Sequence, residues 1–226
     1  MHQRGLAAVA VTARVAALAA VAAAVAVVAA AFTVETAAAF LARRARLGEG
    51  ALARLAAATA AAVSVPVLAA PPKAPSAAAE AQVLDLSKQA IALRSVQGEG
   101  NKTAEVAQLY KRALLGAGWA EKDIEITPID DTAYLVATWQ GSDAKLKPLV
   151  ISGHMDVVEA NPKDWTRDPF TPVVENGYLY GRGASDQKFS MVLAMVGLME
   201  LRKGGYQPKR TIVIAFSGDE ETTMKT

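Results

Sequence analysis

The chain has 226 residues, contains no cysteine and carries a formal net charge of +2 at pH 7. The lack of cysteine excludes a disulfide framework and thiolate metal ligands, so any bound metal must use histidine and carboxylate ligands. Residues 1–80 carry a charge of +4 and 34 alanines, whereas residues 81–226 carry −2 and show no basic footprint for nucleic acid. We therefore predict an Ala-rich N-terminal region over 1–80, a globular domain over 81–226 and no nucleic-acid partner.

Two uncharged apolar segments lie in the N-terminal region. Residues 15–32 approach the length of a membrane span, although 11 of these 18 residues are alanine. Residues 55–68 follow four arginines and precede small residues, which is the layout of a signal peptide. We expect an exported protein, periplasmic or extracellular, with this region as signal segment or membrane anchor; an Ala-rich low-complexity extension is the alternative. The Pro-rich stretch PPKAPSAAAEA then predicts a linker.

The second part of the chain alternates between predicted helices and strands. Helical spacing of apolar residues predicts helices over residues 83–96 and 103–119. Residues 124–129 and 133–139 have the composition of strands, and Asn176-Gly177 predicts a hairpin between two short strands. A long apolar helix is expected to end near Lys203, capped at its start by Ser185 or Asp186. Two further runs, LVISGHMDVV and TIVIAFSGDEE, are apolar on both faces and predict central, covered strands.

This order of elements predicts an α/β domain with three layers: a mostly parallel central sheet with helices on both faces. In such sheets, ligands bind beyond the carboxyl ends of the strands. His154 and Asp156 follow the first apolar strand, and Asp219-Glu220-Glu221 follow the second. Asp186 lies at the expected start of the long helix. The fold therefore brings these polar residues to one edge of the sheet.

Each of these residues also has an ordinary structural explanation. His154 can be a satisfied core histidine, Asp156 a turn cap, Asp186 a helix cap, and the acidic triplet a solvated loop. Their coincidence at one edge favours a site for two divalent cations. Residues 154 and 156 of an extended chain face the same side, so Asp156 can fix the imidazole tautomer of His154. A carboxylate such as Asp186 can bridge two ions, and one of the adjacent glutamates can bind metal while the other acts as general base.

The stretches SGHMDVV, DWTRDPF, YLYGRGASDQK and FSGDEE resemble the co-catalytic zinc metallopeptidase family. This family includes acetylornithine deacetylase, succinyl-diaminopimelate desuccinylase, aminoacylase, and the glutamate and Gly-X carboxypeptidases. The likeness covers residues 82–226 and implies a zinc exopeptidase-like fold with two divalent ions, Zn²⁺ or alternatively Co²⁺. It implies His154, Asp186 and Glu221 as metal ligands, with Asp186 bridging. It also implies Asp156 as the residue that orients His154 and Glu220 as the general base.

The resemblance implies an exopeptidase, carboxypeptidase-like or dipeptidase-like, that cleaves peptides or N-acyl amino acids, with a homodimeric full-length form. The family also uses an acidic ligand and a histidine farther downstream and an inserted dimerisation or lid domain. We do not find them here, so we expect a truncated part of a longer enzyme that is inactive by itself. An inactive fragment that binds peptides or a partner is the alternative. A third interpretation takes GRGAS as a phosphate-binding loop. We do not favour it, because the stretch lacks the full GxGxxG spacing.

Overall fold

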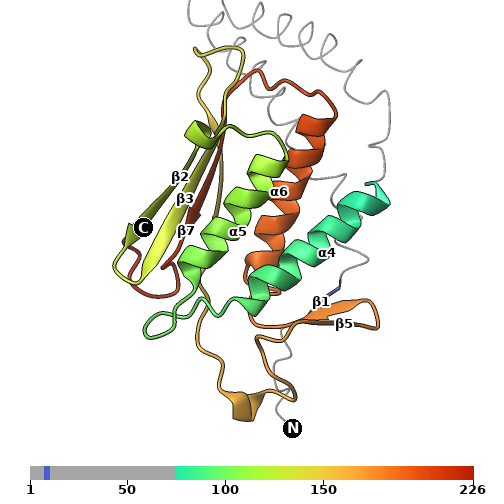
Figure 1. Ribbon diagram of the computed structural model, residues 1–226, viewed down its shortest axis with the longest axis vertical. Coiled ribbons are helices and arrows are strands. Elements are labelled where there is room, and N and C mark those ends of the chain that lie inside the picture. Colours follow the sequence, from blue (N-terminus) through green and yellow to red (C-terminus); the bar gives the residue numbers. More distant parts are fainter. Residues whose placement is uncertain (1–7, 11–74) are drawn as a thin grey trace, which may run out of the picture.

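The computed structural model describes residues 8–10 and 75–226 (Figure 1). Its main body is a four-stranded sheet, in the order β2-β3-β7-β4, packed against helices. The elements of this body are α4 (Ala77–Ala92), α5 (Thr103–Gly116), η1 (Glu121–Asp123), β2 (Ile124–Ile129), β3 (Thr132–Trp139), β4 (Leu149–His154), η2 (Pro162–Asp164), α6 (Lys188–Lys203) and β7 (Ile212–Ser217). A smaller sheet has the order β1 (Ala8–Ala10), β6 (Tyr178–Tyr180), β5 (Val173–Glu175).

Helix α4 begins inside the stretch that was predicted to be a linker. The Oγ atom of Ser76 accepts a hydrogen bond of 3.1 Å from the backbone N–H of Ala79, which caps the helix. Ala79 is buried and belongs to the same core as Val83 and Ile91. Helical structure therefore begins inside the predicted linker, at Ala77. The domain boundary near residue 81 stays a prediction. The expected membrane and signal segments lie outside the described residues.

Helices α5 and α6 match the predicted segments, with two corrections. Helix α5 starts at Thr103 and buries Val106, Tyr110 and Leu114, as its apolar spacing predicted, but it ends at Gly116, three residues before the predicted end. Helix α6 ends at Lys203 as expected, but its N-cap is Gln187, which makes no side-chain capping bond. The prediction that Ser185 or Asp186 caps this helix is therefore wrong. The carboxylate of Asp186 is directed elsewhere, as described below.

The α/β class is confirmed, but the sheet is mixed rather than mostly parallel. Strands β2 and β3 form an antiparallel pair, β3 and β7 are also antiparallel, and β4 and β7 are parallel. A tight turn between β2 and β3 makes that pair antiparallel. Strand β3 is also the direct neighbour of β7 and runs antiparallel to it, which leaves β4 and β7 as the one parallel pair among the described strands of this sheet.

Within residues 75–226, the coverage of the sheet also differs from the expectation of helices on both faces. Figure 1 shows α4, α5 and α6 on the same side of the sheet. Strands β3 and β7 accordingly alternate between buried and half-buried residues. Strand β4 lies at the edge of the described sheet rather than at its centre, and Val150 on it is 54% exposed. None of the described helices is long and apolar enough to cross a membrane.

The parallel pairing of β4 and β7 decides where the site lies. Their register places Leu149 opposite Ile212 and His154 opposite Ser217, so both strands end at the same level. The polar residues that follow each strand therefore meet at one edge, as the sequence predicted. The hairpin at Asn176-Gly177 is also confirmed, since both residues have the positive φ angles, 50° and 77°, of a type I′ turn.

Candidate metal centre

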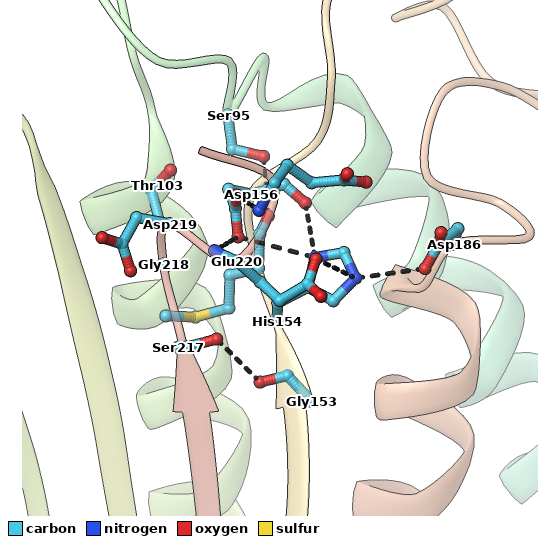
Figure 2. Close-up of polar contacts among 12 residues, drawn as sticks. Ser95, Thr103, Gly153, His154, Asp156, Asp186, Ser217, Gly218, Asp219 and Glu220 are labelled. Atoms are coloured by element: carbon cyan, nitrogen blue, oxygen red, sulfur yellow. Dashed lines mark hydrogen bonds and ion pairs between the residues drawn. The ribbon is translucent and has the colours of Figure 1, made fainter. Parts of the chain in front are cut away.

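His154 is the central residue of the site (Figure 2). It ends β4 and its side chain is only 5% exposed. Its Nδ1 atom lies 3.1 Å from the backbone oxygen of Asp156 and 3.5 Å from the Asp156 carboxylate. Its Nε2 atom faces the opposite way, 3.1 Å from Oδ1 of Asp186. A proton held on Nδ1 by Asp156 leaves the lone pair of Nε2 directed toward the carboxylates, which is the tautomer a metal ligand requires.

Asp156 connects the two strand ends that form the site. Its buried carboxylate accepts hydrogen bonds from the backbone N–H groups of Glu220, at 3.2 Å, and Glu221, at 2.9 Å. The same carboxylate lies beside the His154 imidazole, so one side chain orients both the histidine after β4 and the glutamate pair after β7. The sequence predicted the contact with His154, but the two hydrogen bonds from the glutamate loop depend on tertiary structure and were missed.

His154 and two carboxylates form a group of three potential metal ligands. One ligand atom from each of His154, Asp186 and Glu221 lies within 4.8 Å of the other two. Oε2 of Glu220 is 3.9 Å from Nε2 of His154. The side chains of Asp186 and Glu220 are 70% and 51% exposed, so this group of carboxylates opens to solvent while the imidazole behind it is buried. All five residues to which the sequence analysis gave a role thus lie together, and their individual roles remain predictions.

The electrostatics of this group favour a bound cation. Burial raises the pKa of Glu221, and the charges of Asp186, Glu220 and Asp156 raise it further against the opposing charge of His154. Burial alone lowers the pKa of His154, but its contacts with Asp156 and Asp186 outweigh burial and raise that pKa to about 9. The carboxylates repel one another, and this group therefore holds a proton when no other cation is present. A divalent ion of the type that prefers nitrogen and oxygen ligands would replace that proton, so the residues fit a metal.

The loop that carries the glutamate pair is closed by Asp219. Its carboxylate is buried and accepts hydrogen bonds from the hydroxyl groups of Thr223 and Thr226 and from the backbone N–H groups of Lys225, at 2.6 Å, and Thr226, at 3.0 Å. Burial acts to raise the pKa of Asp219, but these hydrogen bonds prevail and lower it to about 2. Asp219 therefore shapes the loop rather than facing the ligand group, a distinction that the acidic triplet in the sequence did not reveal.

Two further residues beside the site were not singled out from the sequence. Lys188 is fully buried, and Ser95 donates a hydrogen bond of 2.7 Å to the backbone oxygen of Met155. The sequence did offer a signal for Lys188, because a lysine at the start of an otherwise apolar helix is unusual. It offers none for Ser95, whose hydrogen-bond partner lies 60 positions away.

Comparison with protein families agrees with this geometry. Residues 150–225, which include every residue of the ligand group, match the model of peptidase family M20/M25/M40. Residues 150–225 of this chain therefore resemble part of an M20-type catalytic domain. Members of this family are metal-dependent hydrolases, so the resemblance to metallopeptidases and aminoacylases is confirmed. The M20 match begins at residue 150, so it does not include helices α4 and α5.

Curated relatives of the M20 segment include peptidases and acylases. The chain is 35% identical over 138 residues to aminoacylase-1 of Sus scrofa, covering 60% of this chain and 33% of that protein. It is 34% identical over 143 residues to succinyl-diaminopimelate desuccinylase of Variovorax paradoxus, covering 62% and 36%. It is 40% identical over 88 residues to the probable carboxypeptidase S-like 2 of Dictyostelium discoideum, covering 38% and 17%. The chain thus spans about a sixth to a third of the length of these relatives.

Solved structures show the same fold. The M20 family metallo-carboxypeptidase Sso-CP2 from Sulfolobus solfataricus superposes with a TM-score of 0.51 at 23% identity, covering 62% of this chain and 31% of that one. The dipeptidase Dug1p from Saccharomyces cerevisiae gives the same TM-score and identity, covering 64% and 33%. At this level of identity the likeness supports the α/β fold alone.

Proposed function

We propose that the protein is a metal-dependent exopeptidase, of the carboxypeptidase or dipeptidase type, that hydrolyses amide bonds of peptides or N-acyl amino acids. The observation that carries the proposal is the convergence of His154, Asp186 and Glu221 within 4.8 Å, with Glu220 beside them. The names of the relatives, which include carboxypeptidases and aminoacylase-1, support amide hydrolysis without separating peptides from acylated amino acids.

The ligand set suits zinc, with Co²⁺ as a substitute. His154, Asp186 and Glu221 would hold the ions, with Asp186 as the proposed shared ligand. When bound, the ions would polarise the scissile carbonyl and lower the pKa of the attacking water. The chain itself contributes the orientation of these ligands, chiefly through Asp156.

Glu220 is the proposed general base. It is half exposed, so its carboxylate can reach a substrate, and its backbone N–H is fixed by the Asp156 carboxylate at 3.2 Å. In the proposed reaction, Glu220 accepts a proton from the attacking water and delivers it to the leaving nitrogen as the amide bond breaks. Both transfers require a carboxylate that is held close to the ligands without being one of them.

The first test combines metal analysis with turnover. The protein is purified from its native source, its ends are mapped by mass spectrometry, and its zinc content is measured. Glu220→Gln is expected to retain the metal and to lower kcat by about 10²- to 10⁴-fold, since the variant lacks the base but keeps the size of the side chain. Glu175→Gln, a matched change in the β5–β6 hairpin, serves as the control and is expected to leave kcat unchanged.

Hydrolysis of dipeptides is compared in the same experiment with hydrolysis of N-acetylornithine and N-succinyl-diaminopimelate. Faster turnover of dipeptides would support the exopeptidase, and faster turnover of an acylated amino acid would move the proposal to the acylase class. A protein without stoichiometric zinc that is inert toward all these compounds would contradict both. The second candidate, a peptide- or partner-binding module without catalysis, would then explain the site better.

We also propose export of the protein and membrane tethering through the N-terminal region. The support is the sequence of residues 1–80, with two apolar segments that follow arginines. The N-terminal peptide found by mass spectrometry decides this: a mature start near residues 70–80 is expected. A chain that retains residues 1–68 in the soluble fraction of the cell would contradict export.

A further inference from the structure

Lys188 is an unusual residue for the interior of a protein. It is the first residue of α6, two positions after Asp186, and its relative exposure is 0%. Lysine is almost never fully buried unless its ammonium group has partners, because burial of an unpaired charge is costly. The proposed reaction does not use this residue, so its burial calls for another explanation.

The partners of Lys188 are at the end of another helix. Its Nζ atom donates hydrogen bonds of 2.8 Å to the backbone oxygens of Ala90 and Leu93, in the last turn and at the C-cap of α4. Carbonyl groups at a helix C-terminus lack the regular i+4 partner and carry partial negative charge, so an ammonium group is well placed there. The oxygen of Ala90 also accepts the backbone N–H of Leu93 at 3.3 Å. Figure 1 shows α4 lying against the lower part of α6. Lys188 thus fastens the start of α6 to the end of α4.

The chain that leaves α4 in turn holds the segment that contains Asp156. Two residues after Leu93, the buried Ser95 donates from Oγ to the backbone oxygen of Met155 at 2.7 Å. The backbone oxygen of Ser95 accepts from the N–H of Val157 at 2.9 Å. These two hydrogen bonds lie on either side of Asp156. The end of α4 is therefore bonded both to the helix behind Asp186 and to the backbone around Asp156.

Packing around Gly183 supports the same connection. A Cβ atom at Gly183 would lie 3.0 Å from Cγ1 of Val157 and 3.2 Å from Cδ of Lys188. The loop before Asp186, the stem of Lys188 and the segment after Asp156 thus pack closely together and leave little room for a side chain at this glycine. Its φ of +87° also favours glycine.

We propose that Lys188 is a positioning residue for the metal centre. Through the C-terminus of α4 and Ser95, it sets the spacing between Asp186 on one segment and His154 with Asp156 on the other. The inference rests on the proposed function only in assigning metal ligation to Asp186 and His154. Positioning matters because ligands from separate elements must be held within a fraction of an ångström to bind one ion tightly.

The main test replaces the ammonium group by an apolar end of similar length. Lys188→Met is expected to weaken Zn²⁺ binding by about 10- to 100-fold, as loss of outer-shell support does in metal sites. Affinity is measured by competition with a chromophoric chelator on the whole chain. Leu114→Ala is the control, since Leu114 is fully buried in the core at the opposite end of α5 from the site. It is expected to lower the free energy of unfolding without weakening Zn²⁺ binding.

Ser95→Ala tests the route by which Lys188 acts and remains available should Lys188→Met not fold. It removes the hydrogen bond to Met155 and is also expected to weaken Zn²⁺ binding. In a double-mutant cycle, the two changes should be non-additive, because both interrupt the same chain of contacts. Fully additive losses would contradict action through Ser95, and an unchanged affinity in Ser95→Ala would do the same.

A second readout needs no metal. The sequence contains two histidines, His2 and His154, so a His2→Gln background leaves one imidazole. If Lys188 positions Asp186, Lys188→Met disturbs the 3.1 Å contact to Nε2 of His154 and shifts its ¹⁵N resonance at fixed pH, whereas Leu114→Ala does not. A wild-type chain that binds no zinc would contradict the proposed function but leave this test standing. Unchanged zinc affinity and an unchanged resonance in Lys188→Met would overturn the positioning role.

Discussion

Asp156 shows how much of the candidate site depends on one carboxylate. It lies against the Nδ1 side of His154 and accepts both backbone N–H groups of the glutamate pair. Each of these interactions uses its negative charge or its two oxygens. An amide of the same shape would offer one oxygen and would turn a hydrogen-bond donor toward a donor. The ligands after β4 and those after β7 would then lose their common anchor.

We therefore predict that Asp156→Asn weakens Zn²⁺ binding by about 10- to 100-fold, since it releases the imidazole and the glutamate loop together. Chelator competition measures the affinity, and urea unfolding measures the accompanying loss of stability. Asp143→Asn is a matched control, because Asp143 also accepts a backbone N–H, from Lys145 at 3.0 Å, but lies before β4 rather than after it. Equal affinities in the two variants would contradict the role of Asp156.

The sequence predicted the members of this residue group but not all of their contacts. His154, Asp156 and the acidic residues were recognisable because polar groups directly after apolar strands require an explanation. The hydrogen bonds from the glutamate loop to Asp156, and those of Lys188 to the end of α4, join residues 64 to 98 positions apart. Such contacts depend on how elements pack, which local patterns do not contain.

At the scale of elements, local sequence signals predicted the helices and the hairpin well, but they did not predict the arrangement of the sheet. Helices α5 and α6 and the hairpin at Asn176-Gly177 follow from apolar spacing and turn chemistry. The order β2-β3-β7-β4 depends on pairing between distant strands. The sequence therefore suggested a mostly parallel, doubly covered sheet, whereas the one parallel pair among the described strands of this sheet is the pair that carries the site.

The close packing of β3 against the end of β7 gives a prediction at this scale. A Cβ atom at Gly218 would lie 2.1 Å from the backbone oxygen of Ala133 and 2.5 Å from Oγ1 of Thr132. The backbone oxygen cannot move without displacing β3. Gly218→Ala is therefore expected to lower the free energy of unfolding by about 1–3 kcal/mol, as overpacking of a core does. Urea denaturation measures the change.

Gly116 provides the contrast for this experiment. It lies in the last turn of α5 and has no atom within 4 Å of an added Cβ. Gly116→Ala should leave stability unchanged or raise it by up to about 1 kcal/mol, because alanine favours the helix and restricts the unfolded chain. If both alanine variants unfold at the same urea concentration, the contact between β3 and the end of β7 is looser than the structure indicates.

At the scale of the whole molecule, the site couples metal binding to stability through His154. Without metal, contacts with Asp156 and Asp186 raise the pKa of His154 from 6.5 to about 9 in spite of its burial. Because the folded-state pKa is the higher one, the protonated imidazole stabilises the fold fully below pH 6.5, and this contribution is lost as the pH rises toward 9. Zinc needs the neutral imidazole, so the metal and the proton compete for the same nitrogen.

This competition predicts a pH-dependent rise in Tm on addition of zinc. The free Zn²⁺ concentration is held fixed above its Kd. The stability added by zinc should then grow by about 1.4 kcal/mol per pH unit between pH 6.5 and 8.5, because each pH unit lowers the concentration of competing protons tenfold. Differential scanning calorimetry with and without buffered zinc measures the difference. His2→Gln should preserve this slope, and His154→Gln should abolish it. A zinc-induced rise in Tm that is equal at pH 6.5 and 8.5 would show that the ion binds without displacing the proton of His154, and would place the metal away from this imidazole.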